Sequence, residues 1–113
     1  MRNFFRETGI GLSVKNSTTT GSFDFVAPPG AGKRVVIVDV SANVEASFKT
    51  VTAGNYVDPG AGNTTNASGG VGDIVLHVGP GGTSFLAPLR LGENLGLMND
   101  SAAKVTITYY IED

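Results

Sequence analysis

Apolar and polar residues alternate along several short stretches of this chain, and this period of two constrains the fold more than any other feature. In the stretch 105–111 the residues on one face are Val105, Ile107, Tyr109 and Ile111, and those on the other are Thr106, Thr108 and Tyr110. Such alternation is typical of half-buried β-strands, because successive side chains point to opposite faces of a sheet. No stretch of useful length shows the helical period, so the sequence predicts an all-β protein.

The stretch 35–44 has a mixed pattern that predicts a central strand. Its even positions are all apolar, namely Val36, Val38, Val40, Ala42 and Val44. Its odd positions are apolar only at the start, with Val35 and Ile37, and polar at the end. We therefore expect the even positions to face the core and the first half of the other face to be covered too.

Further strands are expected between turns that are rich in Gly, Pro, Asn and Asp. They fall at 9–15, 22–25, 46–52, 73–78, 84–91 and 94–98. Phe48 should point inward, the Gly-Pro-Gly-Gly stretch 79–82 should form a turn, and Pro88 should lie at an edge, bulge or kink. The chain has no Cys and no Trp, the residues that pin immunoglobulin domains. The pattern thus favours an eight-stranded antiparallel β-sandwich of the jelly-roll type.

A length of 113 residues fits one domain. We expect an N-terminal arm at 1–8 and a single β-sandwich domain at 9–113, with a long Gly/Asn/Thr-rich loop at 54–72. Only 16% of the residues are charged, below the average of about a quarter. Part of this neutral polar surface is therefore expected to be buried against a partner.

Charge and hydropathy argue against several partners. The net charge is −2 and no basic stripe is present, so we expect no nucleic acid partner. No apolar run is long enough for a membrane span, and we expect no membrane partner. The N-terminus lacks the apolar core of a signal peptide, which predicts synthesis in the cytoplasm without export.

The segment 27–34, Ala-Pro-Pro-Gly-Ala-Gly-Lys-Arg, superficially follows the spacing of a phosphate-binding loop. Arg34 stands where that motif has a Ser or Thr for magnesium, and a β-branched run follows where the motif requires a helix. We therefore interpret the segment as a Pro-Gly turn that leads into a strand.

Candidate catalytic and metal-binding groups are few. The one histidine, His77, lies on the outward face of its predicted strand, and we expect no enzyme activity, no cofactor and no metal. Asp58 is the only carboxylate in the oxygen-rich stretch 58–66, whereas calcium loops usually supply two or more. Four Asn-X-Ser/Thr triplets are interpreted as turn residues rather than glycan acceptors, and they start at Asn16, Asn63, Asn66 and Asn99.

The N-terminal stretch contains two adjacent aromatic residues flanked by arginines: Arg2, Phe4, Phe5 and Arg6. Aromatic and Arg side chains are enriched in interfaces, so these four are the candidate interface residues. Two interpretations stay open. Phe4 and Phe5 cover the open end of the sandwich, or the arm docks on a neighbouring chain.

A longer motif in the C-terminal half of the chain resembles that of a known protein family. Residues 86–97 read apolar-Ala-Pro-Leu-x-Leu-Gly-Glu-Asn-x-Gly-Leu, followed by a Ser/Ala-rich turn and the strand Val-Thr-Ile-Thr-Tyr-Tyr. With the Gly-rich early strands, this resembles the jelly-roll modules that small bacteriophages use as head decoration, or cement, proteins. The resemblance covers most of the chain. It implies a fold and a structural role, and no individual functional residue.

The resemblance implies a homotrimer on the capsid surface of a virion, bound between subunits of the major capsid protein. Low surface charge, open sheet edges and an apolar arm suit such a protein. The alternative is a carbohydrate-binding, lectin-like module, since jelly rolls often bind sugars. Its aromatic platform would come from Tyr56, Tyr109 or Tyr110, and the lack of Trp counts against it.

Overall fold

The computed structural model describes residues 11–17, 23–54, 56 and 71–113, which form eight β-strands and, within these ranges, no helix. The strands are β1 (Ser13–Asn16), β2 (Phe23–Val26), β3 (Arg34–Ala42), β4 (Ala46–Thr52), β5 (Val71–Val78), β6 (Gly81–Arg90), β7 (Leu95–Asn99) and β8 (Val105–Glu112). All of the expected arm, 1–8, and most of the expected loop, residues 55 and 57–70, lie outside the described residues.

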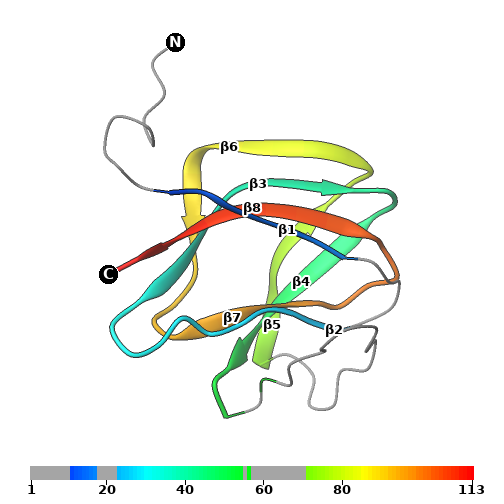
Figure 1. Cartoon of the computed structure of the whole chain (residues 1–113). Helices are drawn as coiled ribbons and strands as arrows, with labels where there is room; N and C mark the ends of the chain where they lie inside the picture. The colour runs from blue at the N-terminus through cyan, green and yellow to red at the C-terminus, as the bar shows by residue number, and fades with distance from the viewer. Residues whose placement is uncertain (1–10, 18–22, 55, 57–70) are drawn as a thin grey trace.

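The strands form two antiparallel sheets of four, in the orders β1-β8-β3-β6 and β2-β7-β4-β5 (Figure 1). Within them β1 pairs with β8, β2 with β7, β3 with β6, and β4 with β5. These are the pairs that result when a long hairpin, with β1–β4 on one arm and β5–β8 on the other, is rolled up. The predicted jelly-roll β-sandwich is confirmed.

The core lies between the two sheets and is built from the inward faces of both. Its largest fully buried side chains are Phe25, Phe48, Ile37, Leu97 and Ile107. Phe48 is inward as expected, and Val105 and Ile107 confirm the inward face of the last strand. Tyr109 packs against this core, whereas Ile111, at the end of the strand, is exposed.

A β-bulge at Val38 changes which side of β3 faces the core. The pairing of β3 with both of its neighbours passes from Ile37 to Asp39 and skips one residue. Because side chains alternate with a period of two, one extra residue exchanges the faces beyond it. Ile37 and Val40 therefore both belong to the core cluster, although one position is odd and the other is even.

The expectation that every even position of 35–44 faces the core is thus wrong before the bulge. Val35 takes the core position there, and Val36 is buried outside the core cluster. Val44 lies beyond the end of β3 and is 47% exposed. The broader expectation holds, since β3 lies between β8 and β6 and both faces of its first half are covered.

β6 is irregular where Pro88 occurs. Leu89 pairs with Ile37 and Ser84 pairs with Asp39, so residues 85–88 of β6 lie opposite the single residue Val38. A proline at a bulge of an outer strand is what the sequence predicted. The predicted turn at 79–82 is too long, however, because β6 already begins at Gly81.

Candidate interaction surface

The loop before β3 is held by the turn between β6 and β7. The amide of Gly30 donates to Asn94 Oδ1 at 2.9 Å, and the amide of Gly32 donates to Glu93 Oε2 at 2.6 Å. The amide of Asn94 in turn donates to the carbonyl of Lys33 at 2.8 Å. Both glycines have positive φ, which orients their amides toward these acceptors.

These contacts explain the loop that superficially follows a phosphate-binding motif. Two of its backbone amides bond to side chains of the same chain, one of them a carboxylate, and strand β3 follows instead of a helix. The interpretation as a Pro-Gly turn leading into a strand is confirmed. Sequence reasoning missed Glu93 and Asn94 as the partners. The sequence signal for these partners was the Gly-Glu-Asn turn at 92–94, because Glu and Asn side chains can accept hydrogen bonds from backbone amides of a loop.

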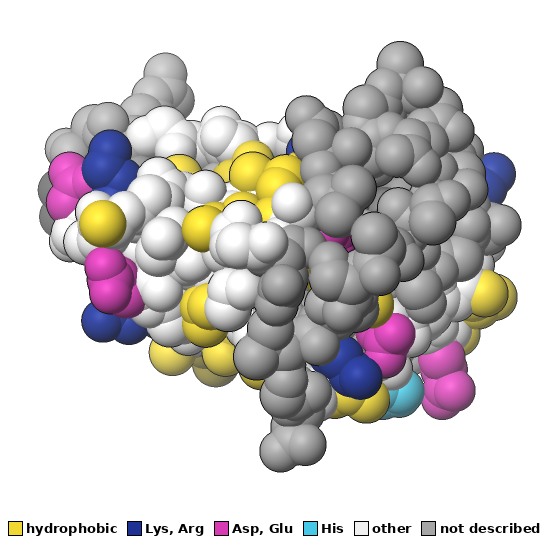
Figure 2. Space-filling model, turned by 90° about the horizontal axis from the view of Figure 1, so that it is seen from below, with side chains coloured by type: hydrophobic (Ala, Val, Ile, Leu, Met, Phe, Trp, Pro, Cys, Tyr) yellow, Lys and Arg dark blue, Asp and Glu magenta, His cyan; other side chains and the backbone are white. Residues whose placement is uncertain are grey.

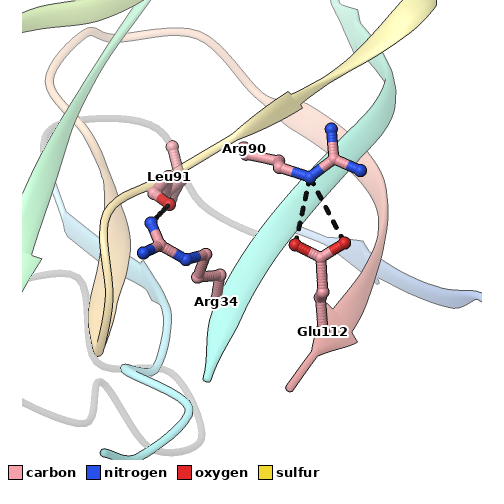
Figure 3. Close-up of polar contacts among 4 residues, drawn as sticks. All are labelled: Arg34, Arg90, Leu91 and Glu112. Carbon is pink, nitrogen blue, oxygen red and sulfur yellow. Dashed lines mark hydrogen bonds and ion pairs between the residues drawn. The ribbon is translucent and has the colours of Figure 1, made fainter. Parts of the chain in front are cut away.

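At the same end of the sandwich, Arg90 of β6 and Glu112 of β8 pair across the strand β3 that lies between them (Figure 3). Arg90 Nε of β6 donates to both carboxylate oxygens of Glu112 of β8, at 3.0 and 3.2 Å. This hydrogen bond and the charge of Glu112 raise the pKa of Arg90. Arg34 Nη1, on the strand between them, donates to the carbonyl of Leu91 at 3.4 Å. Exposed pairs of this kind add little stability, but they leave few unpaired charges at this corner.

His77 lies in a small polar cluster on the outer face of the second sheet. Its Nδ1 lies 3.0 Å from Ser47 Oγ, and its Nε2 lies 4.0 Å from Glu45 Oε1. In Figure 2 the histidine (cyan) is at the surface, as the sequence predicted. Ser47 and His77 are direct cross-strand partners, so the register of β4 and β5 already accounts for their contact.

The tyrosines do not form the exposed platform that the carbohydrate-binding alternative requires. Tyr110 is buried, and Tyr109 is half-buried against the core. Tyr110 lies opposite the buried Val36, on the covered part of the outer face. Of the three candidates only Tyr56, itself half-buried, lies away from β8.

Among the described residues seven large apolar side chains are exposed: Leu12, Val14, Val44, Ile74, Val75, Leu86 and Ile111. Four of them, Val14, Ile74, Val75 and Leu86, lie on the outer strands β1, β5 and β6. Ile74, Val75 and Leu86 belong to β5 and β6, the outer strands on one side of the sandwich. Leu86 is 107% exposed, so none of its surface is lost to the rest of the protein. Figure 2 shows hydrophobic side chains reaching the surface at several places.

The four predicted interface residues, Arg2, Phe4, Phe5 and Arg6, lie outside the described residues, as do Asp58, Asn63 and Asn66. Asn99 is fully buried: its Nδ2 donates to the carbonyl of Ala103 at 2.9 Å, and its Oδ1 accepts from Ser101 at 2.5 Å. Asn99 is therefore the last residue of β7 rather than a turn residue, although its side chain bonds to the turn that follows. Within the described ranges no three His, Asp or Glu side chains are grouped to hold a metal ion, and no helix is long and apolar enough to cross a membrane.

Comparisons with protein-family models, with curated proteins and with solved structures find no match to this chain. The described residues form a jelly-roll sandwich whose outer strands carry exposed apolar side chains.

Proposed function

We propose that this chain is a structural virion protein of a bacteriophage. It decorates and stabilises the capsid by binding between subunits of the major capsid protein, as a homo-oligomer and most simply a homotrimer. The observation that carries the proposal is the set of seven large apolar side chains left exposed on a sandwich of low charge. Outer strands with exposed backbone groups and apolar side chains favour association.

The shape of the fold supports a clamping role. The loop before β3 and the turn before β7 are held together by hydrogen bonds, and exposed charges at that end are paired. A rigid module that loses little conformational entropy on binding suits a protein that must hold neighbouring subunits in fixed positions. The resemblance of residues 86–97 to phage decoration modules agrees with this role.

The proposal is tested with purified protein and with emptied heads of the phage that encodes it. Light scattering should give an oligomeric mass, and the protein should co-sediment with heads that lack it and should raise their resistance to heat. A monomer that ignores the heads would contradict the proposal. If that monomer also bound a glycan array, the carbohydrate-binding alternative would replace it.

The N-terminal arm has its own test. If residues 1–8 dock on the capsid, deletion of these residues should weaken co-sedimentation and leave the melting temperature nearly unchanged. If Phe4 and Phe5 instead cover the end of the sandwich, the deletion should lower the melting temperature, because two aromatic side chains would no longer be buried.

A further inference from the structure

We infer that copies of this chain associate through the β5–β6 side of the sandwich, with Leu86 at the centre of the contact. The β5–β6 side consists of β5, β6 and the two residues between them, Gly79 and Pro80. The inference rests on the homo-oligomer proposed above and names the surface that forms it. The occupant of the surface is a second copy of this chain.

Both strands present an open edge on the same side of the molecule. β6 is the last strand of one sheet and β5 the last strand of the other, and only Gly79 and Pro80 connect them. Within the described ranges, no strand pairs with the outer edge of either. Figure 1 shows β6 at the margin of its sheet, beyond β3. The backbone groups along such edges are ready to bond to another chain.

The irregular pairing of β6 makes Leu86 protrude. Residues 85–88 lie opposite one residue of β3, and Phe85 and Leu89 pack against the core on either side of the protrusion. Leu86 between them has no contact that reduces its exposure. Because Phe85 faces the core, the period of two directs Leu86 to the outer face, and the irregular pairing leaves it without a paired residue on β3 beside it.

The charge of this side suits contact with a copy of itself. Residues 81–89 of β6 contain no Asp, Glu, Lys or Arg, whereas edge strands of monomeric proteins are commonly protected by charges. In a symmetric contact the same patch meets itself, and like charges there would repel. The uncharged stretch around Leu86 avoids that repulsion, and the charged residues of this side, Asp73 of β5 and Arg90 of β6, lie outside that stretch.

The β5–β6 side is also the longer of the two sides. It contains eight residues of β5, ten of β6 and the connecting pair, and the core-facing ones, among them Val78, Phe85 and Leu89, are not available for a contact. The opposite side offers less. β1 and β2 have four residues each, and Val14, the one exposed large apolar residue of β1, is followed by the charged Lys15. Short, charged edge strands are the usual protection against association.

The test compares Leu86→Glu with the matched control Val14→Glu. Val14 is 62% exposed on β1, at the opposite edge of the same sheet. The mass of each variant is measured by light scattering across a dilution series, with circular dichroism as the check on folding. Leu86→Glu should weaken self-association by about 30-fold or more, as loss of a central contact does. Val14→Glu should associate like the unmodified protein.

A second measurement uses the absence of cysteine from the chain. Leu86→Cys and Val14→Cys each provide one thiol for maleimide labelling. Labelling at position 86 should be slow at concentrations where the oligomer forms and fast after dilution, and labelling at position 14 should be fast in both. Equal rates at position 86 would show that the side chain stays exposed and would overturn the inference.

The outcomes separate this inference from the proposed function. If the unmodified protein is monomeric at every concentration, the homo-oligomer and the inference both fail. If it is oligomeric and Leu86→Glu remains so, the inference fails and the proposed function stands. If Leu86→Glu stays oligomeric but no longer binds heads, the β5–β6 side contacts the shell instead of another copy, which also overturns the inference.

Discussion

The absence of a side chain at Gly96 lets β7 lie close to the segment that follows β2. A Cβ atom at this position would lie inside van der Waals contact of the carbonyl oxygen of Val26 and of the Pro28 ring. Two residues earlier, Asn94 has a φ of 52°, a conformation that Asn tolerates better than most residues, and its side chain accepts the amide of Gly30. The motif Gly-Glu-Asn-x-Gly therefore has a structural explanation in this chain, which its resemblance alone does not supply.

Gly96→Ala should lower the free energy of unfolding by about 1 to 3 kcal/mol, because the new methyl group meets backbone that cannot move aside cheaply. The measurement is urea denaturation followed by circular dichroism. Gly11→Ala is the control, since a Cβ there meets nothing within 4 Å. Equal stability of the two variants would show that the backbone near Pro28 can move aside at little cost in free energy.

At the scale of elements, the alternation of side chains predicted all eight strands, and the bounds of β4 were predicted without error. The facing and pairing of residues within the strands differ from the prediction where the backbone is irregular. The bulge at Val38 exchanges the faces of β3, and residues 85–88 leave the β6 ladder. A bulge adds one residue without a distinctive sequence, and here Pro88 was the only indication. The outward position of Leu86 agrees with its alternation with Phe85, whereas the irregular pairing around it was not predictable from periodicity.

The connection from β7 to β8 is organised by the buried side chain of Asn99. Asn99→Asp would place a carboxylate oxygen against the carbonyl of Ala103, which at neutral pH should cost about 2 to 4 kcal/mol of unfolding free energy. Burial raises the pKa of the introduced carboxyl, and its protonated form can donate to that carbonyl. The loss should therefore shrink as pH falls, in denaturation curves measured from pH 7 to pH 4.

Asn16→Asp is the control for this change. Asn16 is exposed, and its Oδ1 accepts from Thr106 Oγ1, a role that a carboxylate retains. Its stability should differ little from that of the unmodified protein at either pH. A comparable, pH-dependent loss in Asn16→Asp would mean that added negative charge, rather than the bond to Ala103, explains the effect.

At the scale of the whole molecule, the fold class and the jelly-roll type were predictable because period-two patterns and turn residues report on local structure. The pairing of strands distant in sequence was not, since no local pattern determines which edges meet. β1 and β8 come from opposite ends of the chain, yet Ser13 lies opposite Tyr109. The interface expected at positions 2–6 stays a prediction, because these residues lie outside the described ones. The exposed apolar residues of β5 and β6 became apparent only from the fold.

The sandwich should unfold as one cooperative unit, because its core is built from both sheets. Two isoleucines of β8 test how much that core contributes to stability. Ile107 is fully buried between the sheets, so Ile107→Ala should lower the unfolding free energy by about 2 to 5 kcal/mol. Ile111→Ala, on the same strand but exposed, should lower it by less than about 1 kcal/mol. Far-UV circular dichroism and tyrosine fluorescence should give coincident transitions at fixed protein concentration. Separate transitions would show that the two sheets lose structure independently.

The antiparallel pairing of β1 with β8 has a practical consequence for anything attached to this protein. The start of β1 and the end of β8 are neighbours at one corner of a sheet, and Figure 1 shows both on the same side of the molecule. Fusion partners or labels joined before Gly11 or after Asp113 would therefore extend from the same corner of the molecule. Such attachments would project away from β6, at the far edge of that sheet, and so away from the surface proposed for self-association.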